Sequence, residues 1–184
     1  MIWVENNEKS SNPFIFLSVY FIKATKNGLL CIFLQQSIFI KRLRENEKTI
    51  IFKDFAHAPS KLLATSKAVV KQFPKRKVIA CLELHTFSSL NKNFLSQYED
   101  TFDKPDVSIV YYNPDTLKHK NLPEITPADI RKGFNKSKLE VFTQRSKLQE
   151  YLKSLDLTDC VLLLMSSGNF GGINLKEFAN QLIK

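Results

Sequence analysis

The stretch Cys160-Val-Leu-Leu-Leu-Met-Ser166 (CVLLLMS) decides the fold class, because five consecutive large apolar residues follow its cysteine without polar alternation. A strand that alternates apolar and polar residues leaves one face in water, whereas a continuous apolar run is typical of a strand buried on both faces of a parallel sheet. Val78–Leu84 (VIACLEL) and Val107–Tyr112 (VSIVYY) have the same character. The three runs predict a sheet that is covered by helices on both sides.

Outward from these runs, strand patterns alternate with helical patterns from residue 49 to the end of the chain. Two further strands are predicted at Thr49–Asp54 and Leu139–Thr143. The predicted helices span residues 59–73, 89–100, 127–134, 144–155 and 174–183, and a loop with several prolines spans 113–127. The β-α-β-α order predicts an α/β fold with a doubly wound, mostly parallel, Rossmann-like sheet and helices on both faces.

Residues 1–48 follow a different pattern, with an apolar run at Pro13–Ile22 that resumes at Leu29–Leu34. Ten residues are too few for a membrane span, which needs about 20. The run is also a poor signal peptide, because the start is acidic and no small-residue cleavage site follows. We expect it to pack as a strand or a helix, or to be an atypical extension foreign to the domain.

The composition is that of a soluble globular protein, with 43% hydrophobic and 24% charged residues, and the length of 184 residues suits one well-filled domain or a domain plus an appendage. The net charge of +9 and a pI near 9.4 raise the possibility of nucleic-acid binding. Residues 61–80, however, hold six basic residues and no acid, and their spacing predicts a helix with a solvated basic face. Without a known nucleic-acid-binding signature, we expect no nucleic-acid partner and keep that class only as an alternative resting on this cluster.

Metal and disulfide chemistry is not predicted from the cysteines. Cys31, Cys81 and Cys160 are widely spaced, odd in number, and form no Cys/His ligand spacing. We expect buried reduced thiols in a cytosolic protein and no metal site.

Candidate chemistry lies in the loops that follow the predicted strands, because ligands of a doubly wound sheet bind beyond the carboxyl ends of its strands. After the first strand come Asp54 and His57, and Pro59 then suits the first position of a helix that Ala58 cannot cap. The free N–H groups of such a helix start favour an anion. Asp54 could orient a sugar hydroxyl or a metal-bound water and His57 could contact a phosphate or base; alternatively, Asp54 caps the turn and His57 is a loop residue.

Two further loops have unusual composition. Glu83–Ser89 places polar side chains directly after an apolar strand, either for ligand binding or because Ser88 or Ser89 caps a helix. Ser166–Gly172 holds three of the five glycines, so the backbone must turn sharply there or approach a ligand closely. In a parallel sheet all three loops fall on one edge, which predicts a single site.

The strings DFAHAPSK (residues 54–61), LELHTFSSL (82–90) and LLLMSSGNFGG (162–172) resemble the C-terminal domain of the Mur ligase family. The likeness is to the branch that acts on UDP-N-acetylmuramate and adds L-alanine or recycles the murein tripeptide. It runs from about Phe39 to Lys184, which predicts an atypical apolar extension over residues 1–38 and an incoming-substrate-binding domain over 39–184. Compared with the family pattern, Ala58 replaces a histidine, and the arginine that the family often has near the positions of Ser88 and Ser89 is replaced.

The resemblance implies part of a bacterial, cytoplasmic, ATP-dependent ligase of peptidoglycan synthesis or recycling. Such an enzyme activates the carboxylate of UDP-N-acetylmuramate as an acyl phosphate, and an amino acid or the tripeptide L-Ala-γ-D-Glu-meso-diaminopimelate then displaces phosphate to form an amide. ATP and Mg are held mainly by a central domain. By resemblance, the residues facing the nucleotide are Asp54, His57 and Pro59. Those on the incoming-substrate side are His85, Ser88, Ser89, Ser167, Gly168, Asn169 and Gly171. No residue is predicted as catalytic.

One motif of the complete family is absent from these 184 residues. The glycines are Gly28, Gly133, Gly168, Gly171 and Gly172, and none belongs to a GxxxxGK[ST] phosphate-binding loop. We therefore expect a detached C-terminal domain that cannot hydrolyse ATP or form the amide alone. The alternative is a stand-alone module that binds a nucleotide or peptide without catalysis.

Overall fold

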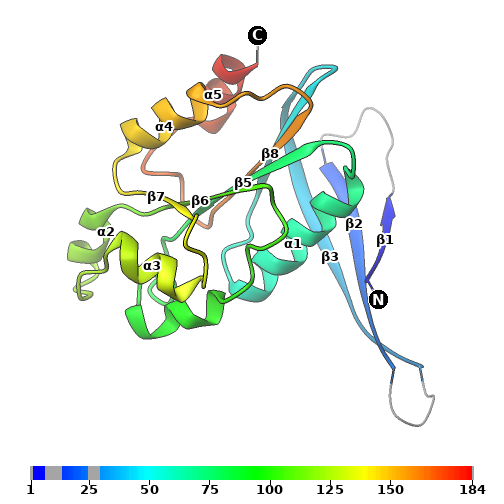
Figure 1. Ribbon diagram of the computed structural model, residues 1–184, viewed down its shortest axis with the longest axis horizontal. Helices are drawn as coiled ribbons and strands as arrows, with labels where there is room; N and C mark the ends of the chain where they lie inside the picture. The colour runs from blue at the N-terminus through cyan, green and yellow to red at the C-terminus, as the bar shows by residue number, and fades with distance from the viewer. Residues whose placement is uncertain (1, 7–13, 25–29, 184) are drawn as a thin grey trace.

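The computed structural model describes residues 2–6, 14–24 and 30–183 of the chain, with side chains described from Ile40 onward. These residues form a mixed sheet in the order β1-β2-β3-β4-β8-β5-β6-β7 (Figure 1). The strands are β1 (Ile2–Asn6), β2 (Phe14–Ala24), β3 (Leu30–Glu45), β4 (Thr49–Asp54), β5 (Lys77–Glu83), β6 (Val107–Tyr111), β7 (Glu140–Phe142) and β8 (Cys160–Met165).

Four of the seven strand pairs in the described sheet are parallel, and they include the apolar central strands, as their sequences predict. β4, β8, β5, β6 and β7 pair in parallel, whereas β1, β2, β3 and β4 pair antiparallel. β8, the last strand in the sequence, lies between β4 and β5 at the centre of the sheet. The predicted α/β, mostly parallel architecture is confirmed.

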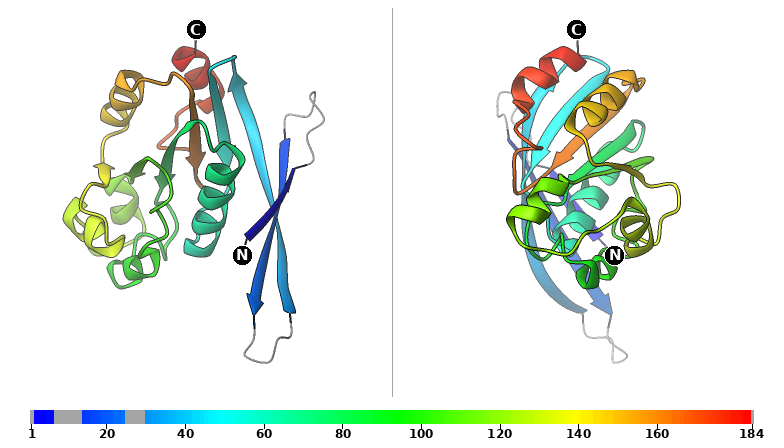
Figure 2. Two further views of the ribbon diagram at one scale, coloured as in Figure 1. Left: turned by 45° about the vertical axis from the view of Figure 1, so that its right-hand side comes forward. Right: turned by 90° about the vertical axis from the view of Figure 1, so that its left-hand side faces the viewer.

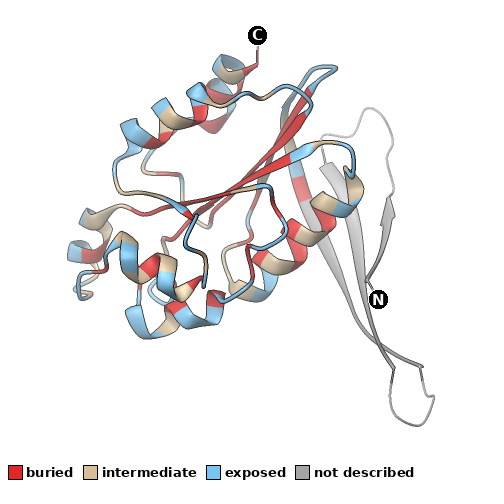
Figure 3. Cartoon of the chain, viewed as in Figure 1, coloured by how far each residue is buried: buried red, intermediate tan, exposed pale blue. Residues whose placement is uncertain are grey.

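The helices cover both faces of the sheet. They are α1 (Pro59–Gln72), the 3₁₀ helix η1 (Lys92–Tyr98), α2 (Pro114–His119), α3 (Pro127–Gly133), α4 (Arg145–Ser154) and α5 (Leu175–Leu182). Alternate residues of β8 enter two separate cores. Val161 and Leu163 pack with α1 and α3 on one face, whereas Leu162 and Leu164 pack with α4 and α5 on the other. Figure 3 accordingly shows the central strands buried and the helices buried along the side that faces the sheet.

Two predicted elements differ from the structure. The helix expected over 89–100 is the shorter 3₁₀ helix η1, which begins at Lys92 because Asn91 caps it by accepting a hydrogen bond from the N–H of Asn93. The loop expected over 113–127 contains α2, which Asn113 caps and Pro114 begins. The ends of the other helices and strands predicted from residue 49 onward agree with the structure to within one residue, which is the usual uncertainty of an element boundary.

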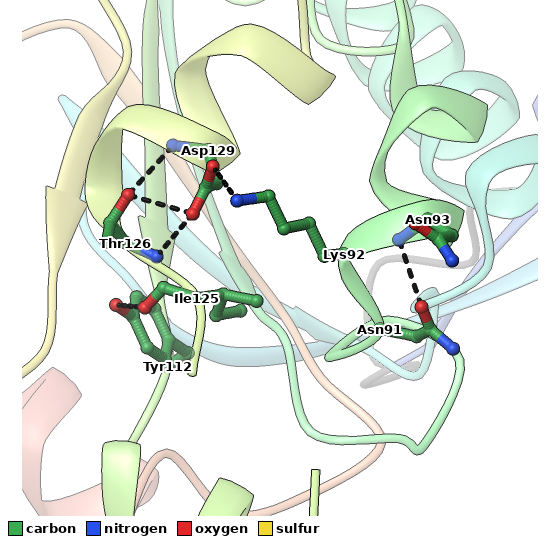
Figure 4. Close-up of polar contacts among 7 residues, drawn as sticks. All are labelled: Asn91, Lys92, Asn93, Tyr112, Ile125, Thr126 and Asp129. Carbon is green, nitrogen blue, oxygen red and sulfur yellow. Dashed lines mark hydrogen bonds and ion pairs between the residues drawn. The ribbon is translucent and has the colours of Figure 1, made fainter. Parts of the chain in front are cut away.

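Polar contacts join the 3₁₀ helix η1 to the short helix α3. Lys92 of η1 forms an ion pair with Asp129 of α3 at 2.7 Å (Figure 4). Asp129 also closes a capping box with Thr126 at the start of α3, and the Tyr112 hydroxyl donates to the carbonyl oxygen of Ile125 at 2.7 Å. These bonds hold α3 against the end of β6.

The antiparallel strands β2 and β3 form a long hairpin that projects beyond the α/β part of the chain (Figure 2). β3 runs from Leu30 to Glu45, so the boundary predicted between residues 38 and 39 falls inside one strand. The apolar run at Pro13–Ile22 takes the strand conformation in β2, from Phe14 on. None of the helices described is long and apolar enough to cross a membrane.

Candidate functional site

The three loops selected from the sequence begin at the same edge of the sheet. β4 and β5 flank β8 and both run parallel to it. In the register of these pairs, Asp54 at the end of β4 and Leu82 near the end of β5 both lie opposite Met165. Because the strands end level with one another, the loops after Asp54, Glu83 and Met165 leave side by side, as predicted.

The Glu83 side chain joins the second loop to the third. Its exposed fraction is 3%, and its carboxylate accepts hydrogen bonds from the Ser166 hydroxyl, from the N–H of Phe170 at 2.8 Å and from the N–H of Gly171 at 3.2 Å. Buried carboxylates are costly unless hydrogen bonds satisfy them. Three donors from one loop therefore fix both the acid and the path of residues 166–172.

Two glycines of this loop, Gly168 and Gly171, lie where a side chain has no room. A Cβ on Gly168 would approach Glu83 Oε2 to 2.8 Å and the His85 ring to 2.9 Å. Gly171 has φ +65°, and a Cβ there would be 2.5 Å from the Tyr111 hydroxyl oxygen. Arg145 donates from Nη1 to the carbonyl oxygen of Gly171 at 2.9 Å. The close approach inferred from the glycine content thus involves the protein's own side chains.

Asp54 is held on both oxygens at the end of β4. Oδ1 accepts the N–H of Phe55 at 2.7 Å, and Oδ2 accepts the Thr65 hydroxyl of α1 at 2.8 Å. Burial raises the pKa of Asp54, and the bonds to Thr65 and to the backbone oppose the rise. The carboxylate therefore fixes the turn between β4 and α1, as the structural alternative expects, and a contact of Asp54 with a ligand stays a prediction.

The start of α1 has the geometry expected of an anion site. Pro59 is its first residue, and Ala58 occupies the cap position with no side-chain hydrogen bond. The first turn of α1 also has no acidic residue. His57 Nδ1 lies 2.8 Å from the carbonyl oxygen of Phe55, so Nδ1 donates and Nε2 is the remaining ring nitrogen. The exposed Phe55 ring contacts the His57 ring edge-to-face.

The second loop places His85 beside the third loop, Ser166–Gly172, which we call the glycine loop. The two serines of the second loop lie in other surroundings. The His85 ring lies against Gly168, as the spacing above shows. The buried Ser89 hydroxyl bonds only within its own turn, to Thr86, and Ser88 is exposed. Neither serine caps a helix, because η1 begins later at Lys92; that alternative was wrong.

The remaining predicted residues of the third loop have distinct environments. The Ser167 hydroxyl is buried and has no hydrogen-bond partner among the described residues. Asn169 is exposed, and its Oδ1 accepts the N–H of Gly172 at 3.0 Å. Asn169 therefore stabilises the turn through its oxygen and keeps its amide NH₂ group for other contacts.

Sequence reasoning did not assign a role to Glu83, Tyr111 or Arg145. The available signal for Glu83 was an acid at the end of an otherwise apolar strand, VIACLEL. Tyr111 ends β6 and stacks on Phe170 with ring centroids 6.4 Å apart, and burial, followed by the charge of Glu83, raises its pKa. No local pattern predicts Arg145, because its contact with Gly171 crosses 26 residues.

The start of α1 and the acidic, histidine and cysteine side chains of the described residues bear on the predicted ligands. The uncapped start of α1 leaves backbone N–H groups of the kind that favour an anion, and the contact of this turn with ATP stays a prediction. In the described residues no three His, Cys, Asp or Glu side chains gather into a possible metal site. The Mg that the resemblance implies for the intact enzyme stays a prediction.

Comparison with known proteins identifies the fold. No protein family model matches the sequence. A UDP-N-acetylmuramoyl-L-alanyl-D-glutamate–2,6-diaminopimelate ligase superposes on 98% of this chain with a TM-score of 0.55 and 8% identity. MurF ligase from Thermotoga maritima, solved in complex with ADP, superposes on 99% with a TM-score of 0.50 and 13% identity. This chain covers 45% of the length of each ligase. The chain has the α/β fold of a Mur ligase C-terminal domain.

Proposed function

We propose that this chain is the incoming-substrate-binding part of an ATP-dependent ligase that joins an amino acid or peptide to UDP-N-acetylmuramate. The reaction belongs to peptidoglycan synthesis or recycling in the bacterial cytoplasm. One observation carries the proposal: the loops that bear the DFAHAP, LHTFSS and SSGNFGG strings meet at one sheet edge, where Glu83 ties the second to the third. The proposal is supported by the fold that the chain shares with two ligases. One is a UDP-N-acetylmuramoyl-L-alanyl-D-glutamate–2,6-diaminopimelate ligase, and the other, MurF, was solved in complex with ADP.

In this proposal the chain's residues bind and orient substrates. Asp54 and His57, with the start of α1 at Pro59, face the nucleotide. His85 and the loop from Ser167 to Gly171 shape the side on which the amine enters, with Ser88 and Ser89 at its border. The incoming amine attacks the acyl phosphate and displaces phosphate, so the protein must hold the amine close to the carbonyl carbon and exclude water.

Calorimetry tests the substrate assignment on the full chain. The ligands are ATP, L-Ala-γ-D-Glu-meso-diaminopimelate and L-alanine. We expect saturable binding of ATP and of one of the two amines, and His85→Ala should weaken only the amine. His119→Ala removes an exposed histidine of α2 and is the matched control. If neither amine binds, or if both variants weaken the amine equally, the assignment is wrong.

A ligation assay tests the catalytic part. With UDP-N-acetylmuramate, ATP and amine, the purified chain should form no amide, because its sequence has no phosphate-binding loop. Amide formation by the chain alone would contradict this. Adding a Mur ligase that lacks its own C-terminal domain should start ligation. Ligand binding without ligation in that mixture would instead support a binding module without catalysis.

A further inference from the structure

A pocket lies at the edge of the sheet opposite the candidate site. Its volume is about 530 Å³, and its walls come from the turn before β4, the loop between α4 and β8, and the end of α5. These segments lie together at one end of the molecule (Figures 1 and 2). Thr49 lines the pocket and begins β4, whereas Asp54 ends that strand. At about 3.3 Å per residue, the pocket is therefore about 16 Å from the loops of the candidate site.

One part of the pocket lining is apolar. It consists of Leu155, Leu157, Leu182 and Ile183. All four pack with the core beneath α4 and α5, but the three leucines are only half-buried. Apolar side chains that line a concave surface favour a ligand with an apolar body, because binding removes more of their surface from water.

Two lysines, Lys48 and Lys153, give the same pocket a positive charge. Both are exposed, and neither forms an ion pair with a described residue. The Lys153 ammonium group lies 5.7 Å from the centroid of the Phe178 ring, so it reaches from α4 toward α5. Asp156 is the one carboxylate among the described lining residues. Two ammonium groups and one carboxylate leave one net positive charge, which matches a ligand with one negative charge.

Amide side chains of the lining add hydrogen-bond donors. Asn46 Oδ1 accepts the N–H groups of Lys48 and Thr49, at 3.0 and 2.7 Å. Because the backbone uses its oxygen, the NH₂ group of Asn46 is the end left for a ligand. The exposed Gln181 of α5 contributes a second amide. A carboxylate in this pocket therefore has both ammonium and amide donors within the lining.

Two features of the same pocket oppose an anion. The helices α4 and α5 both end there, and the C-terminal end of a helix carries a partial negative charge. Hydrogen bonds from the backbone and the side chain of Thr158 lower the pKa of Asp156, which keeps this acid charged at neutral pH. Lys153 lies in the last turn of α4 and offsets the dipole of that helix. Ligands that differ only in their charge measure the balance between these groups.

We propose that this pocket binds a monocarboxylate with a short apolar body. The carboxylate accepts from Lys48, Lys153 and the Asn46 amide, and the hydrocarbon part covers the half-buried leucines. Charge-assisted hydrogen bonds of this kind are stronger than neutral ones. The pocket shares no residue with the loops assigned to ATP and to the incoming amine, so its failure and the failure of the ligase proposal are distinguishable.

NMR titration of the ¹⁵N-labelled full chain tests the site. Sodium hexanoate, hexanol and hexylammonium chloride have the same apolar body with a negative charge, no charge and a positive charge, and sodium acetate has the negative charge without that body. NaCl keeps the ionic strength constant. We expect saturable shifts of the backbone amides of residues 46, 48, 153, 155–158 and 181–183, with hexanoate binding most tightly. If any of the other three probes binds as tightly as hexanoate, the proposal is wrong.

Lysine variants test the charged part of the site. Lys48→Gln and Lys153→Gln should each weaken hexanoate binding about threefold, which is the size of effect expected of an exposed ion pair, and leave hexanol binding unchanged. Lys138→Gln is the matched control, because Lys138 is exposed and lies outside the pocket. It should change the affinity by less than about 1.5-fold, since distant surface charges are screened. Equal weakening by the control and the pocket variants, or shifts that do not saturate with hexanoate, overturn the proposal.

Discussion

Glu83 and Ser166 lie 83 positions apart in the sequence and share a hydrogen bond in the buried space between the ends of β5 and β8. The same carboxylate accepts two backbone N–H groups of the following residues, Phe170 and Gly171. The serine hydroxyl in turn accepts the N–H of Gly168 at 2.6 Å. One acid therefore determines the shape of the whole glycine loop, and its removal should affect the loop more than any residue on the loop surface.

Glu83→Gln should destabilise the chain by about 1–3 kcal/mol. Glutamine replaces one acceptor oxygen with an NH₂ donor, so at least one donor of the 166–171 segment loses its partner in a buried place. Urea unfolding measures the change. Glu99→Gln makes the same substitution at an exposed residue and should stay within about 0.5 kcal/mol of the parent. Equal effects of the two variants would show that the Glu83 contacts contribute nothing.

Gly171→Ala should destabilise the chain by more than about 1 kcal/mol, because alanine is strained at the left-handed φ of +65° and its Cβ meets the Tyr111 hydroxyl. Tyr111→Phe removes that oxygen and leaves the nearest ring carbon at 3.4 Å. In a double-mutant cycle, the alanine should therefore cost less in the phenylalanine background. Strict additivity would mean that the two groups do not meet.

Parallel topology explains why the position of the site was predictable while its internal contacts were not. The strand Thr49–Asp54 was predicted with the bounds that it has, and parallel strands with matched ends force their loops to one edge. Residue periodicity carries no such information about Glu83, whose partners come from a loop more than 80 residues away. Ser88 and Ser89 were wrongly considered as helix caps, because several polar residues in one loop compete and Asn91 caps η1 instead.

Asp54→Asn should gain stability relative to the parent chain as the pH rises from acid to neutral. Burial raises the folded-state pKa of Asp54 above 3.8, so the folded chain prefers the neutral acid. The stability that this preference contributes is fully present below the unfolded pKa and is lost as the pH rises through the folded pKa. Asparagine is neutral throughout. Urea unfolding of both chains across this range checks the trend, and a constant difference would contradict it.

The ion pair between Lys92 and Asp129 should have the opposite pH dependence. The hydrogen bond from Lys92, followed by bonds from Thr126, lowers the pKa of Asp129 to about 2. A lowered pKa contributes stability that is present above the unfolded value of 3.8 and is lost as the pH falls toward 2. Lys92→Met should reduce this loss. Thermal unfolding of both chains between pH 3.8 and about pH 2 measures this loss of stability. An identical loss in the parent and the variant would exclude the ion pair as the cause.

The uncapped start of α1 allows stability and nucleotide binding to be separated. Ala58 has the extended backbone of a cap residue (φ −80°, ψ 149°) but no side-chain acceptor. Ala58→Ser should therefore stabilise the chain by about 1 kcal/mol. If the free N–H groups of this turn bind the nucleotide, as the proposed function requires, the new hydroxyl competes for them and ATP binds more weakly in calorimetry.

Gln144→Ser is the matched variant, because Gln144 also precedes a helix, α4, without capping it through its side chain. It should give a similar gain in the urea midpoint and leave ATP binding unchanged, since α4 is not part of the proposed nucleotide face. Stabilisation by Ala58→Ser with unchanged ATP affinity would show that the nucleotide does not use the start of α1. The absence of a cap at Ala58 would then have no functional reason, and the assignment of Asp54, His57 and Pro59 to the nucleotide would lose its physical basis.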